Sequence, residues 1–157
     1  DGELLVESIT EILKTLGLRV DDKKDEYLED RSILNEQGQE IALIEIKGLN
    51  GNVTNKNIYQ ADSHKGRKEK PNDFPSILIV NTLIKSSNSI DEKMKEIGSE
   101  QVEIAVNKKV LIMRSIDLLN LLYLKEACKI SKEDITGIFI GKIGWLCVSQ
   151  NKYEIKQ

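Results

Sequence analysis

The stretch Glu40–Gly48, which reads Glu-Ile-Ala-Leu-Ile-Glu-Ile-Lys-Gly, decides the fold of this 157-residue chain. Aliphatic and β-branched residues dominate the stretch, which predicts a β-strand. A strand that is apolar on both faces belongs in the middle of a sheet, with helices packed above and below it. Both alternating sets are apolar here, with Ile41 and Leu43 on one face and Ala42, Ile44 and Ile46 on the other.

An acid and a base interrupt this apolar pattern near its end. Glu45 and Lys47 continue the face of Ile41 and Leu43, because side chains two apart on a strand point the same way. Burying unpaired charge costs free energy. A charged pair at the end of a buried strand therefore indicates a chemical role rather than a structural one.

The residues just before this strand predict its neighbour. Residues 30–34 form a second short strand, and the polar loop 35–39 contains a glycine, so the two strands make an antiparallel hairpin. A turn centred in that loop pairs residues whose numbers sum to about 75, which sets Leu34 opposite Ile41.

The same register sets Asp30 opposite Glu45. Directly opposed side chains have Cβ atoms roughly 4.5–5.5 Å apart, and like charges there are unfavourable. A divalent cation between the two carboxylates would satisfy both. A slip of one residue would move Asp30 to the other face. Glu29 is the alternative acid, but strand alternation and the register favour Asp30.

The rest of the chain alternates helical and strand patterns. Strands are expected over residues 76–81 and 110–113, and a terminal pair over 143–149 and 153–155 suggests a small β appendage. Helices are expected over residues 4–16, 58–68, 89–97, 99–107 and 115–125, and from residue 131. This order predicts an α/β fold with a mixed central sheet flanked by helices.

Length and composition predict one domain spanning residues 1–157. The chain opens with Asp1 rather than Met, so it is open whether the domain is cut from a longer protein. No run approaches the length of a membrane span and no signal peptide opens the chain, so we expect a cytoplasmic protein that does not enter a membrane. Cys128 and Cys147 are isolated in apolar surroundings and predict reduced core residues.

An acid some 15 residues upstream of Glu-Ile-Lys at the end of a central strand resembles the active site of the PD-(D/E)xK nuclease superfamily, which includes many restriction endonucleases. Asp30, Glu45, Lys47 and, downstream, Gln60 carry the resemblance, which covers roughly residues 4–80. It implies a restriction endonuclease-like fold. It also implies a Mg²⁺-dependent deoxyribonuclease that hydrolyses phosphodiester bonds, belongs to a restriction, repair or phage-defence protein, and accepts Mn²⁺ in place of Mg²⁺.

These residue types suit that chemistry. Mg²⁺ prefers oxygen ligands, keeps several waters and takes one or two carboxylates, so Asp30, Glu45 and the backbone carbonyl of Ile46 are the expected ligands. A bound metal lowers the pKa of a water and polarises the phosphate. Lys47 would hold the attacking water or neutralise the developing charge. Gln60 resembles the glutamine that helps position water or metal in exonuclease-like branches, the alternative being a plain polar residue on a helix.

One further acid is a candidate metal ligand. Many members of the superfamily carry an acid on their first helix that contributes to a second metal, and Glu7 resembles it. On a helical wheel, however, Glu7 lies nearly opposite the apolar stripe of its helix. That geometry favours a surface glutamate.

The segment of residues 55–70 is basic, with five lysines and arginines against two acids, although the whole chain has a net charge of −3. Such a segment suits contacts to a phosphate backbone, the alternative being a solvated helix face. No helix-turn-helix or zinc finger is present, so sequence specificity would have to come from loops, additional domains or partner proteins. A homodimer is a further expected partner. The expected DNA contacts are Lys56, His64, Lys65, Arg67 and Lys68, with a solvated surface histidine as the alternative for His64.

Two other interpretations stay open. The first is a catalytically lapsed module with the nuclease fold that binds DNA or serves in assembly, which metal uptake dependent on Asp30 would distinguish. The second is an unrelated α/β protein in which Glu45 and Lys47 pair with their neighbours.

Overall fold

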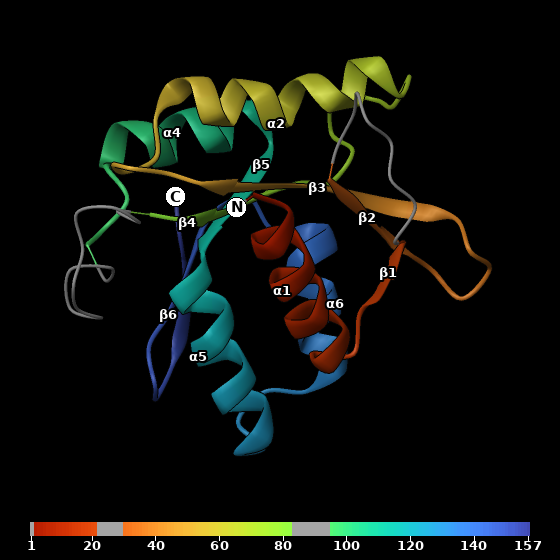
Figure 1. Ribbon diagram of the computed structural model, residues 1–157, viewed down its shortest axis with the longest axis vertical. Helices are drawn as coiled ribbons and strands as arrows, with labels where there is room; N and C mark the ends of the chain where they lie inside the picture. The colour runs from red at the N-terminus through yellow and green to blue at the C-terminus, as the bar shows by residue number, and fades with distance from the viewer. Residues whose placement is uncertain (1, 22–29, 83–94) are drawn as a thin grey trace.

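The computed structural model describes residues 2–21, 30–82 and 95–157. Its centre is a seven-stranded mixed sheet in which the spatial order of strands, β1 to β7, follows their order in the chain (Figure 1). The strands are β1 (Arg19–Asp21), β2 (Arg31–Leu34), β3 (Glu40–Gly48), β4 (Ser76–Asn81), β5 (Val110–Arg114), β6 (Gly144–Val148) and β7 (Tyr153–Lys156).

Helices cover both faces of this sheet (Figure 1). In the described ranges they are α1 (Gly2–Thr15), α2 (Asn55–Arg67), α4 (Ser99–Lys108), α5 (Ser115–Glu126) and α6 (Lys132–Gly141). Helices α2 and α4 lie on one face, and α1, α5 and α6 lie on the other. The expected α/β architecture with a mixed sheet between helices is confirmed.

Strand β3 is central, as its two apolar faces predict. Ala42, Ile44 and Ile46 are at most 5% exposed and belong to the core shared with α1, α5 and α6. On the other face, Leu43 is buried, and the neighbouring strands contribute Leu78 and others to a second core under α2 and α4. Burial on both faces places β3 where a charged side chain would be costly unless it found partners.

The hairpin register is confirmed over most of β2. Strands β2 and β3 are antiparallel, and the pairs run from Arg31 opposite Ile44 to Ile33 opposite Ala42. The two residue numbers in each of these pairs sum to 75, as expected. The expectation for Leu34 was wrong, because an irregularity after Ile33 sets it opposite Glu40 instead of Ile41. An extra residue on one strand of a hairpin is the usual effect of a β-bulge, and here it lies at the turn end, away from Asp30.

Strands β3, β4, β5 and β6 are parallel to one another, and β7 returns antiparallel to β6. The terminal strands are therefore part of the main sheet, and the expectation of a separate β appendage was wrong. Helix α6 precedes β6 in the chain, and Ser131 is its N-cap. The Oγ of Ser131 accepts a hydrogen bond from the backbone N–H of Asp134 at 3.0 Å.

Three other expectations have mixed outcomes. Of the helix expected over residues 89–97, residues 89–94 lie outside the described residues. Residues 95–97 are described and are not helical. Both cysteines are free. Cys128 is exposed, so its assignment to the core was wrong, whereas Cys147 is half-buried and packs against the second core. None of the helices in the described ranges is long and apolar enough to cross a membrane.

Candidate functional site

Glu45 is the centre of a polar cluster between β3 and α2. Its side chain is only 4% exposed, and three donors surround its carboxylate. Oε1 lies 3.0 Å from Nζ of Lys47 and accepts a hydrogen bond from Nε2 of Gln60 at 3.1 Å. Oε2 lies 2.7 Å from Nε2 of His64. The buried acid on the central strand is therefore balanced by neighbours from its own strand and from one helix.

Helix α2 supplies two of these donors because Gln60 and His64 lie one turn apart and so share a helix face. The helix starts at Thr54, whose side chain caps the first turn, and it packs on the sheet through Ile58 and Ala61, which are fully buried. This packing brings Gln60 within hydrogen-bond distance of Glu45.

His64 differs from its expected position. It is 3% exposed and contacts Glu45, so both a DNA contact and a solvated surface histidine were wrong. The spacing of four residues from Gln60 was the available signal. It could not be used, because only the packing of α2 shows that this helix face meets β3.

Asp30 lies beside Glu45, immediately before β2. Its backbone N–H donates to the carbonyl of Ile44 at 3.0 Å, and its Oδ2 accepts a hydrogen bond from the N–H of Ile46 at 2.7 Å. These two bonds bracket Glu45 on β3. The next side chain, Arg31, leaves in another direction and donates from Nε to Oγ1 of Thr10 on α1. Glu29, the alternative acid, lies outside the described residues.

The two carboxyl groups have pKa values shifted in opposite directions. Burial raises the pKa of Asp30 and the nearby charge of Glu45 raises it further, which together outweigh the hydrogen bond from Ile46 and the charge of Lys47. Burial also acts on Glu45, but hydrogen bonds from His64 and Lys47 outweigh it and hold the pKa of Glu45 below its usual value. Folding therefore favours the ionised form of Glu45 and disfavours the ionised form of Asp30.

Glu7 does not join this cluster. It is exposed on α1, which packs against the face of β3 opposite to the one that carries Glu45. Within the described residues, no group of three or more His, Cys, Asp and Glu side chains is arranged to hold a metal ion. Among the described residues of this cluster, the carboxyl groups are those of Asp30 and Glu45.

The basic residues of α2 divide into two groups. Lys56 and Arg67 are exposed, as a surface for phosphate contacts requires. Lys65 is 2% exposed, and its Nζ donates to the carbonyls of Asn72 and Lys108 and pairs with Asp62, so its assignment to the DNA surface was wrong.

Lys68 is also engaged within the protein. Its Nζ lies 2.6 Å from Oε2 of Glu40, and its side chain is 18% exposed. Half-burial and a close carboxylate make it a poor contact for DNA. A periodicity of charge along a sequence does not distinguish a solvated lysine from one that ties a helix end to the sheet.

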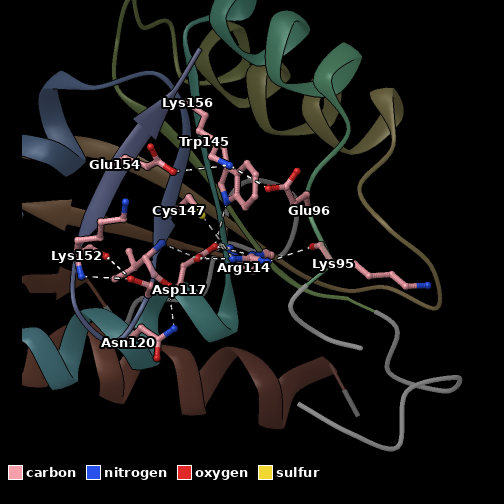
Figure 2. A network of polar contacts seen from close by, with 12 residues as sticks. Lys95, Glu96, Arg114, Asp117, Asn120, Trp145, Cys147, Lys152, Glu154 and Lys156 are labelled. Atoms are coloured by element: carbon pink, nitrogen blue, oxygen red, sulfur yellow. Dashed lines mark hydrogen bonds and ion pairs between the residues drawn. The ribbon is translucent and has the colours of Figure 1, made fainter. Parts of the chain in front are cut away.

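A second polar cluster, which the sequence did not predict, lies where β5, α5 and β6 meet (Figure 2). Asp117 is fully buried, and its carboxylate accepts hydrogen bonds from Arg114 and from the indole N–H of Trp145 at 3.1 Å and the backbone N–H of Val148 at 2.9 Å. The guanidinium of Arg114 also lies 4.7 Å from the centre of the Trp145 ring. Because the donors saturate this carboxylate, the cluster is structural.

Comparison with protein-family models, with curated proteins and with solved structures finds no match for this chain.

Proposed function

We propose that the chain is a metal-dependent deoxyribonuclease domain of the PD-(D/E)xK superfamily with the restriction endonuclease-like fold. The observation that carries the proposal is the convergence of Asp30, Glu45 and Lys47 at the end of the buried strand β3. Gln60 reaches the same carboxylate from the following helix. The mixed sheet between two layers of helices, with α2 directly after β3, also supports the proposal.

The donor set fits Mg²⁺. That ion needs only one or two carboxylates, because it keeps several waters, so two acids without a third are compatible with it. Asp30 is a half-buried carboxyl whose ionised form is disfavoured by burial and by Glu45, and a divalent cation would remove that penalty. Asp30, Glu45 and the carbonyl of Ile46 would hold the ion, with Mn²⁺ as a substitute. When bound, it would supply Lewis-acid and water-activating chemistry.

The protein's own residues then have separate roles. Lys47, whose side chain is 32% exposed next to Glu45, would hold the attacking water or stabilise charge that develops on the phosphate. Gln60 would orient the carboxylate of Glu45 or the water beside it. Lys56 and Arg67, both exposed on α2, would contact the DNA backbone without reading its sequence. Sequence specificity would come from other domains, a partner protein or a second copy of the chain.

The direct test is cleavage of plasmid DNA by the purified domain with Mg²⁺ or Mn²⁺. We expect Glu45→Ala and Lys47→Ala each to reduce the rate by at least about a hundredfold, in the range of a lost general acid–base or electrostatic group. Glu103→Ala, an exposed site on α4, is the matched control and should cut like the wild type. Equal rates for the wild type and the Glu45 variant would refute the enzymatic function.

A catalytically lapsed module with the same fold is the second candidate. It is favoured by the three donors that already occupy the Glu45 carboxylate and by the net charge of −3. Titration with Mn²⁺ separates the two candidates, because a lapsed module would take up no ion in a manner that depends on Asp30.

A further inference from the structure

His64 is the only histidine in the chain. It is buried, and its ring forms a hydrogen bond with Glu45. The ring is 3% exposed and its Nε2 lies 2.7 Å from Oε2 of Glu45. Charge-assisted hydrogen bonds of this length are among the stronger polar contacts in proteins. The ring therefore fixes one oxygen of a carboxylate whose position the proposed reaction depends on.

The donor and acceptor roles follow from the surroundings. Glu45 is ionised at neutral pH and can only accept hydrogen bonds, so Nε2 must carry the proton. The other ring nitrogen, Nδ1, is buried and has no hydrogen-bond partner among the described side chains. A proton on Nδ1 would be a buried donor without an acceptor, which costs about 1–3 kcal/mol. For the neutral ring, both observations select the tautomer that carries its proton on Nε2.

The two oxygens of Glu45 are held differently. Oε2 is bound on the interior side by His64, whose side chain is 4% exposed. Oε1 is shared by Gln60 and by Lys47, whose side chain is 32% exposed. An ion that arrives from solvent can displace the flexible lysine far more easily than the buried ring.

We propose that His64 is a positioning residue that anchors Oε2 of Glu45 and so presents Oε1 to a divalent cation. The inference rests on the proposed function and adds a residue to it. Mutation of a residue that holds a metal ligand in place typically lowers the metal affinity by about tenfold to a hundredfold. His64 does not itself contact the ion or the substrate.

The test compares two amides that differ in reach. The side-chain nitrogen of glutamine can replace Nε2 of histidine, whereas that of asparagine is too short to reach Oε2. We expect His64→Asn to weaken Mn²⁺ binding, measured by calorimetry, by about tenfold or more, and His64→Gln to stay within about threefold of the wild type. Ile58→Val, at a fully buried apolar site on the same helix, controls for general loosening of α2.

Equal Mn²⁺ affinities for His64→Asn, His64→Gln and the wild type would overturn the positioning role. If the wild type takes up no Mn²⁺, the proposed function fails, and the positioning role fails with it. If His64→Asn is unfolded by its thermal melt, His64→Leu provides the same comparison, because it also lacks a donor. A loss of affinity as large in Ile58→Val as in the asparagine variant would likewise refute the proposal.

A second readout needs no metal. Because the chain has one histidine, protein labelled with [¹⁵N]histidine gives a single set of ring signals. We expect a slowly exchanging proton on Nε2 in the wild type, and rapid exchange of the Nε2 proton in Glu45→Ala. A ring without a proton on Nε2, or an Nε2 signal that does not change in Glu45→Ala, would show that the ring does not hold the carboxylate.

Discussion

At the scale of single residues, the candidate site is a contrast between two acids. Glu45 is surrounded by donors, and its pKa is lowered, whereas Asp30 is half-buried beside another carboxylate, and its pKa is raised. Relative to the unfolded chain, folding thus shifts Glu45 toward its ionised form and Asp30 toward its neutral form. Such divergent pKa values are more common at functional sites than elsewhere.

The raised pKa of Asp30 leads to a prediction about stability. A carboxyl whose pKa is raised on folding stabilises the fold at low pH, and this contribution is lost as the pH rises through the pKa of the folded state. Asp30→Asn stays neutral and keeps a carbonyl oxygen for the N–H of Ile46. In EDTA at pH 7 we expect the variant to melt a few degrees higher than the wild type, by about 2–4 °C for each kcal/mol gained.

Thermal melts from acid to neutral pH check this expectation. The difference between Asp30→Asn and the wild type should disappear below the usual aspartate pKa of about 3.9, where both side chains are neutral. A variant that is less stable than the wild type at pH 7 in EDTA would contradict the prediction, since it would mean that the ionised carboxylate of Asp30 stabilises the metal-free fold.

At the scale of elements, the junction of β5, α5 and β6 depends on one buried ion pair. Asp117 accepts hydrogen bonds from Arg114 at the end of β5, and from Trp145 and Val148 on β6 (Figure 2). One carboxylate thus fixes where α5 begins and how the last parallel strand is placed. Burial of the guanidinium is tolerated because Asp117 compensates it, and the pKa of Arg114 is raised by that pair despite burial.

We expect Asp117→Ala to reduce the free energy of unfolding by about 3–5 kcal/mol, because it leaves a buried guanidinium without its partner. The double variant Arg114→Met with Asp117→Leu should recover a large part of that loss, since apolar residues of similar size can replace a buried pair. Urea denaturation measures both. If the single and double variants were equally unstable, the cost would lie in the hydrogen bonds to β6 rather than in the uncompensated charge.

At the scale of the whole molecule, the net charge of −3 means that the proposed DNA binding would depend on a local surface. Lys56 and Arg67 are exposed, whereas Lys65 is buried and the side chain of Lys68 is 18% exposed. Affinity for DNA should therefore be modest and should fall with salt in proportion to the few phosphates that are contacted.

The corresponding prediction concerns the salt dependence of binding. With Glu45→Ala to prevent cutting, the pair Lys56→Ala and Arg67→Ala should weaken duplex binding and reduce the slope of log affinity against log salt by about two. Fluorescence anisotropy over roughly 50–200 mM salt measures it. Lys142→Ala, exposed at the end of α6 on the other layer, is the control and should leave the slope unchanged. An unchanged slope in the double variant would place the DNA surface elsewhere.

The sequence by itself determined the sheet centre and most of the hairpin. Apolar residues on both alternating faces of β3 required helices on both sides, and a short loop required β2 to run antiparallel, so the register that brings Asp30 beside Glu45 followed from local chemistry. These are properties of neighbours in the chain. The resemblance to the nuclease superfamily, and not local chemistry, singled out Gln60 on the helix after β3.

Only the tertiary structure decided which polar side chains of that helix became buried. His64 and Lys65 follow one another, yet one contacts Glu45 and the other ties α2 to the carbonyls that end α4. Likewise, β6 joins β5 because Asp117 and the core beneath α5 position it, not because of a pattern within residues 144–148. Burial depends on what packs above each position, and that partner comes from distant parts of the chain.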